Sequence, residues 1–76
     1  MKRYFFDLVS GSRAEYDYQG RELGTPEQAR ELAELIALDL EIASSDGQWT
    51  GWSVDVRNAR GRREFCIPVQ PMGLAA

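Results

Sequence analysis

Histidine is absent from these 76 residues, and cysteine occurs once, at Cys66. The missing imidazole removes the commonest general base and every Ser-His or Cys-His arrangement. A single thiol cannot close an intramolecular disulfide, and without histidine the usual zinc ligand sets cannot be assembled. We therefore expect no catalytic residues, no metal and no cofactor, and we interpret the chain as non-enzymatic.

Long apolar runs are also missing. The apolar residues after Met1 are interrupted by Asp7 and end at Ser10, which is too short for a signal peptide, and no stretch approaches the roughly 20 apolar residues of a membrane span. Cysteine scarcity fits a reducing compartment. We expect a cytoplasmic protein with no membrane association.

Positive charge is scarce overall, since nine basic residues face twelve carboxylates. The net charge of −3 makes nucleic acid an unlikely partner in general. The distribution is uneven, because residues 1–50 hold five basic residues against ten carboxylates, whereas residues 51–76 hold four arginines against two carboxylates. The four arginines are one candidate contact for an anion or nucleic acid, the alternative being a solvated turn: Arg57, Arg60, Arg62 and Arg63.

One helix is predicted from Thr25 to about Ser45. Thr25 is suited to capping, Pro26 to the first helical position, and no glycine or proline follows within the segment. At 100° per residue, one apolar face would cover a sheet. That face comprises Ala29, Leu32, Ala33, Ile36, Leu40 and Ala43, with Ala37 at its edge.

A second apolar stripe lies on the same helix, at Leu35, Leu38 and Ile42. It either packs beneath a loop of its own chain or forms an interface, and we favour the interface. A domain of this size is near the margin of independent stability, and oligomerisation is the stabilising device still open to it. We therefore expect a homodimer.

Strands are predicted on both sides of the helix from period-2 alternation. They cover residues 3–9, 14–18, 52–57 and about 64–69, with residues 17–20 as a turn. The order predicts a two-layer α+β domain, ββαββ, with a four-stranded antiparallel sheet in the order 2-1-3-4 and one long helix packed on one face. We expect a single domain over residues 1–70 and a flexible C-terminal tail over residues 71–76.

Three side chains in the second half of the chain, Trp49, Trp52 and Cys66, could lie either in the core or at the surface. Trp52 is expected in the core, from its phase with Val54 and Val56. Trp49 is either a lid on the end of the core or an aromatic that binds a partner. Cys66 is expected to be a small, partly buried strand residue rather than a redox thiol.

Several motifs together resemble a known family. Arg3 to Leu8, then Asp17-x-x-Gly20-x-Glu22-Leu23 before an alanine-rich helix, and later Trp52 to Val56, are similar to short alphaproteobacterial proteins catalogued as domain of unknown function 6894. The resemblance implies a fold but no activity or catalytic residue. A looser similarity, limited to Thr25 to Ala29, is to antitoxin domains of the HicB type. We expect a small homodimeric interaction or regulatory module. The alternative is an antitoxin-like accessory domain that binds nucleic acid or an anion.

Overall fold

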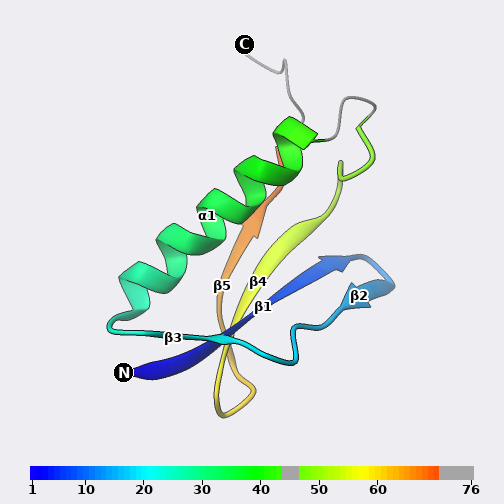
Figure 1. Cartoon of the computed structure of the whole chain (residues 1–76). Coiled ribbons are helices and arrows are strands. Elements are labelled where there is room, and N and C mark those ends of the chain that lie inside the picture. Colours follow the sequence, from blue (N-terminus) through cyan, green and yellow to red (C-terminus); the bar gives the residue numbers. More distant parts are fainter. Residues whose placement is uncertain (44–46, 71–76) are drawn as a thin grey trace.

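The computed structural model describes residues 1–43 and 47–70. The element order is β1 (Lys2–Ser10), β2 (Arg13–Glu15), β3 (Arg21–Leu23), α1 (Pro26–Ala43), β4 (Ser53–Asn58) and β5 (Arg63–Pro68). Figure 1 shows α1 running along one side of an antiparallel sheet. The predicted α+β class and the helix on one face of the sheet are confirmed. The expected tail, residues 71–76, lies outside the described residues.

The sheet order is β2-β1-β4-β5, with β3 paired to the other half of β1. The predicted order of the four strands is therefore confirmed, but the sheet has a fifth strand, β3. The predicted second strand is also too long, since β2 ends at Glu15. β2 pairs with the C-terminal half of β1, and β3 pairs with its N-terminal half. One edge of the sheet thus consists of two short strands joined by the loop at residues 16–20.

The start of α1 follows the predicted capping pattern. Thr25 Oγ1 accepts a hydrogen bond from the Gln28 N–H at 3.1 Å, and Gln28 Oε1 accepts one from the Gly24 N–H at 2.8 Å. Pro26 occupies the first helical position, where a missing N–H costs nothing. The predicted C-terminal end at Ser45 lies outside the described residues, within which the helix extends to Ala43.

The core lies between α1 and one face of the sheet. It is centred on Ala29, Ala33 and Ala37, which are fully buried against Tyr4 and two valines of β4. These alanines recur every four residues, so the helix backbone approaches the sheet closely. The prediction placed Ala37 at the edge of this face and Ala43 within it. In the structure, Ala37 is buried with Ala29 and Ala33, and Ala43 is exposed. The face of α1 that packs on the sheet is therefore centred on the row of alanines, which differs from the predicted face.

The two tryptophans close one end of the core. Trp49 and Trp52 contact each other edge to face, with ring centroids 5.1 Å apart, and both pack partly buried against the core. Trp52 therefore belongs to the core region as predicted, and Trp49 serves as the lid. Cys66 is exposed, contrary to prediction, because β5 is an edge strand and this side chain alternates with Phe65 and Ile67, which pack against the core.

Candidate functional site

The outer stripe of α1, defined as Leu35, Leu38 and Ile42, is exposed to solvent. The exposed fractions are 59%, 46% and 61%, respectively. At 100° per residue the stripe lies nearly opposite the buried alanine row, so it faces away from the sheet. No described segment of the chain covers it. The sequence thus located an apolar surface, and the structure places its three members side by side on the outer side of the helix.

Carboxylates surround the outer stripe. Helix α1 carries five carboxylates and a single basic residue, Arg30. Arg30 is held by Glu34 at 3.5 Å and lies 5.9 Å above the Phe65 ring, so it is directed toward β5. The residues nearest the stripe are therefore acidic: Glu31, Glu34, Asp39 and Glu41.

The four arginines of the β4–β5 hairpin do not form one surface. Arg57 and Arg63 pair with Asp7 and Asp55 on the face of the sheet away from α1, which we call the open face. Arg60 and Arg62 lie in the exposed turn, where their backbone N–H groups donate to Asn58 Oδ1 at 2.9 and 3.0 Å. Figure 1 shows this turn at the same end of the molecule as the N-terminus.

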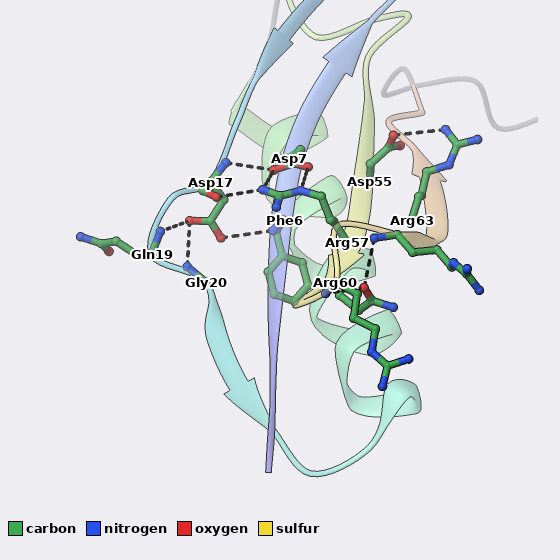
Figure 2. Close-up of polar contacts among 11 residues, drawn as sticks. Phe6, Asp7, Asp17, Gln19, Gly20, Asp55, Arg57, Arg60 and Arg63 are labelled. Atoms are coloured by element: carbon green, nitrogen blue, oxygen red, sulfur yellow. Dashed lines mark hydrogen bonds and ion pairs between the residues drawn. The ribbon is translucent and has the colours of Figure 1, made fainter.

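A cluster that the sequence did not predict occupies the open face: Asp7, Asp17 and Arg57 (Figure 2). Arg57 donates from Nε to Asp7 Oδ2 at 2.9 Å and from Nη2 to Asp7 Oδ1 at 3.2 Å. Nη2 also donates to the Asp17 carbonyl at 3.2 Å, and the guanidinium lies 4.6 Å above the Phe5 ring. The hydrogen bonds from Arg57 to Asp7 raise the pKa of Arg57, although burial opposes them.

Asp17 organises the loop between β2 and β3. Its Oδ1 accepts from the Gln19 and Gly20 N–H groups at 3.0 and 3.1 Å, and its Oδ2 accepts from the Phe6 N–H at 3.1 Å. Burial acts to raise the pKa of Asp17. The backbone hydrogen bonds from Gly20, Phe6 and Gln19, with the charge of Arg57, outweigh burial and lower that pKa.

Gly20 is required by this geometry. Its φ is +71°, and a Cβ there would lie 2.8 Å from the Tyr4 carbonyl oxygen and 2.9 Å from Phe5 Cε1. The Asp17-x-x-Gly20 motif thus has a structural explanation, since Asp17 accepts the loop N–H groups and Gly20 lets the loop pass close to β1. One sequence signal could have revealed the cluster: Asp7 interrupts the apolar run at residues 4–9, and a buried carboxylate needs a partner.

The family follows from the sequence match. Residues 3–70 match the model of the family described as a domain of unknown function, DUF6894. The chain belongs to the DUF6894 family. Comparison with curated proteins found no match, and comparison with solved structures found none either. The matched range includes the Asp7, Asp17, Gly20 and Arg57 cluster as well as the outer stripe of α1.

Residues 1–43 and 47–70 hold neither a metal-binding cluster nor a membrane-spanning helix. No group of three or more carboxylates and thiols there could hold a metal ion. No helix in that part of the chain is long and apolar enough to cross a membrane. The outer stripe of α1 and the open face of the sheet are the features that call for a functional explanation.

Proposed function

We propose that this DUF6894 protein is a non-enzymatic homodimeric interaction module whose protomers associate through the outer stripe of α1. The observation that carries the proposal is the exposure of Leu35, Leu38 and Ile42 on a helix whose other apolar face already covers the sheet. The stripe is nearly symmetric about Leu38, with one member three residues before it and one four residues after it. An antiparallel twofold contact would set Leu35 of one protomer against Ile42 of the other.

The expected strength of this contact follows from the exposed fractions. Complete burial of a leucine or isoleucine is worth about 1.5–3 kcal/mol. Because the three side chains are already about half covered, the dimer gains about 2.5–5 kcal/mol per protomer, or about 5–10 kcal/mol in total. Association costs about 4–15 kcal/mol. The stripe therefore supports a dimer that is weak and concentration-dependent rather than obligate.

The acidic residues around the stripe determine how salt should affect the affinity of the proposed dimer. An antiparallel twofold contact brings the carboxylates that flank the stripe, Glu31, Glu34, Asp39 and Glu41, toward the carboxylates that flank it on the partner helix, and like charges repel. Salt screens this repulsion and strengthens apolar burial. The dimer should consequently become tighter as sodium chloride is added, whereas a contact with a basic partner would become weaker.

Sedimentation equilibrium from about 5 to 500 µM, at low and high salt, tests the proposal. We expect concentration-dependent dimerisation that salt strengthens and that Leu38→Glu abolishes. Ala43→Glu is the matched control, since it adds the same charge to an exposed position of α1 off the stripe. A chain ending at Gln70 should dimerise as the full chain does. A monomer under all conditions would contradict the proposal, as would dissociation by both substitutions.

A second candidate function is anion binding at the turn end of the molecule. A hollow of about 480 Å³ there is lined by residues that include Lys2, Arg3 and Arg60. The contact would therefore use Arg60 with Lys2 rather than all four hairpin arginines, because Arg57 and Arg63 are paired with carboxylates and Arg62 does not line the hollow. Titration with a mixed-sequence oligonucleotide at low salt tests this. No binding, or binding unchanged by Arg60→Gln with Lys2→Gln, would refute it.

A further inference from the structure

The edge of the sheet that β2 and β3 form is interrupted at Phe6. β2 pairs with Leu8 to Ser10 of β1, and β3 pairs with Lys2 to Tyr4, so neither strand covers residues 5–7. The Phe6 N–H donates instead to Asp17 Oδ2 at 3.1 Å (Figure 2). A hollow of about 330 Å³ opens between this interrupted edge and α1, and we call it the notch.

The notch has an apolar wall and one arginine on the helix side of the sheet. Phe6 of β1 lines it together with Leu32 and Ile36 of α1, and all three side chains are partly buried. Arg21 of β3 also lines it. Arg21 is the cross-strand neighbour of Tyr4, which is buried in the core between the sheet and α1. Because directly opposed residues share a face of the sheet, the Arg21 side chain lies on the same side as α1.

The two charged groups of the notch differ in what they already bind. Asp17 lines the notch, but its Oδ1 accepts from the Gln19 and Gly20 N–H groups and its Oδ2 accepts from the Phe6 N–H. In contrast, the ion pairs found within residues 1–43 and 47–70 do not include Arg21. Its guanidinium is therefore open to a ligand, and a carboxylate matches the planar donors of a guanidinium.

We propose that the notch binds a small-molecule carboxylate with an unbranched apolar chain, the carboxylate on Arg21 and the chain against Phe6, Leu32 and Ile36. The volume lies at the lower end of the range for small-ligand sites, about 300–1,000 Å³, which favours a chain of medium length. Leu32 and Ile36 lie about 60° and 100° around α1 from Leu35, on the flank between the outer stripe and the sheet. The inference therefore does not depend on dimerisation.

Amide chemical shifts of the full chain, followed during titration with sodium octanoate, test the proposal. Sodium acetate carries the carboxylate without the chain, and n-octylammonium chloride carries the chain with the opposite charge. We expect saturable octanoate shifts centred on Phe6, Gly20, Arg21 and Ile36, no saturation with acetate, and weaker binding of n-octylammonium. Tighter binding of n-octylammonium than of octanoate would overturn the proposal, as would octanoate shifts centred on the outer stripe of α1.

Substitutions separate the role of Arg21 from general charge effects. Arg21→Gln should weaken octanoate binding about 2- to 5-fold, the change expected for loss of an exposed ion pair, and Arg21→Lys should retain most of the affinity. Arg62→Gln is the matched control, since it makes the same charge change in the exposed β4–β5 turn and should leave the affinity unchanged.

Leu38→Glu separates the notch from the proposed dimer. This substitution disrupts the outer stripe but changes no residue that lines the notch, so octanoate should bind as it does to the unmodified chain. Loss of octanoate binding in Leu38→Glu would contradict the placement of the site. If the unmodified chain does not bind octanoate, or if Arg21→Gln and Arg62→Gln weaken binding equally, the proposal is wrong and Arg21 serves to protect the sheet edge from pairing with other chains.

Discussion

The substitution Arg57→Gln tests whether the Asp7–Asp17–Arg57 cluster holds the β2–β3 loop against the sheet. The change removes both hydrogen bonds to Asp7, the bond to the Asp17 carbonyl and the contact with the Phe5 ring. It leaves Asp7, whose side chain is 5% exposed, as a buried carboxylate. Within the described part of the chain, the hydrogen bond that Asp7 then keeps is the one from the Asp17 N–H at 2.9 Å.

The expected cost follows from burial. Removing one partner of a fully buried ion pair costs about 3–5 kcal/mol. Because the Arg57 side chain is 27% exposed, water can partly replace it, and we expect about 2–3 kcal/mol. Small domains are stable by little more than about 5 kcal/mol, so this loss is large. With a urea dependence of about 1 kcal/mol/M, the unfolding midpoint should fall by about 2–3 M.

Urea unfolding, followed by the fluorescence of Trp49 and Trp52, measures this cost. Arg60→Gln, in the exposed turn, is the control and should change the free energy of unfolding by less than about 0.5 kcal/mol. A double-mutant cycle with Asp7→Asn should give a coupling energy of about 1–3 kcal/mol. Equal effects of Arg57→Gln and Arg60→Gln would refute the reasoning, and so would strict additivity of Asp7→Asn with Arg57→Gln.

Two further predictions concern the same loop. Gly20→Ala should destabilise the fold by more than Gly61→Ala, which has a similarly positive φ but nothing within 4 Å of a new Cβ, and thermal unfolding of the two variants measures the difference. Because the pKa of Asp17 is lowered from 3.8, the unfolded chain takes up this proton at a higher pH than the folded chain does. Stability should therefore be retained above about pH 4 and lost as the pH falls further, and Asp17→Asn should flatten that slope in urea unfolding between pH 3 and 6.

Much of the fold could be predicted because its signals are local. Thr25 and Pro26 mark the start of α1, and alternation of apolar residues marks β1, β4 and β5. β3 could not be recognised, since Arg21–Leu23 is three residues long and two of them are charged. β2 ends early because Asp17, in the loop that follows it, is held to β1 and β4. Its Oδ2 accepts from the Phe6 N–H and its carbonyl accepts from Arg57, and these are contacts between distant segments that no local pattern reveals.

The candidate sites also divide into one that local sequence predicts and one that depends on contacts between distant segments. The period of α1 was enough to predict an apolar stripe at Leu35, Leu38 and Ile42. The roles of Arg57 and Arg63 depend on strand register, which pairs Asp7 with Asp55 across β1 and β4 and brings each carboxylate to an arginine. Because the sequence does not reveal that register, four arginines near one turn indicated a basic surface. In the structure two of them, Arg60 and Arg62, lie in the exposed turn, whereas Arg57 and Arg63 pair with carboxylates.

Cysteine crosslinking at Leu38 tests the proposed dimer most directly. In a Cys66→Ser background, Leu38→Cys places one thiol beside the proposed twofold axis, and Glu27→Cys places one on the same helix about three turns away. If the protomers associate through the outer stripe of α1, mild oxidation should yield a disulfide-linked dimer rapidly with Cys at position 38, and much more slowly at position 27. Equal rates at the two positions, or no crosslinking at position 38 at several hundred micromolar protein, would contradict the account.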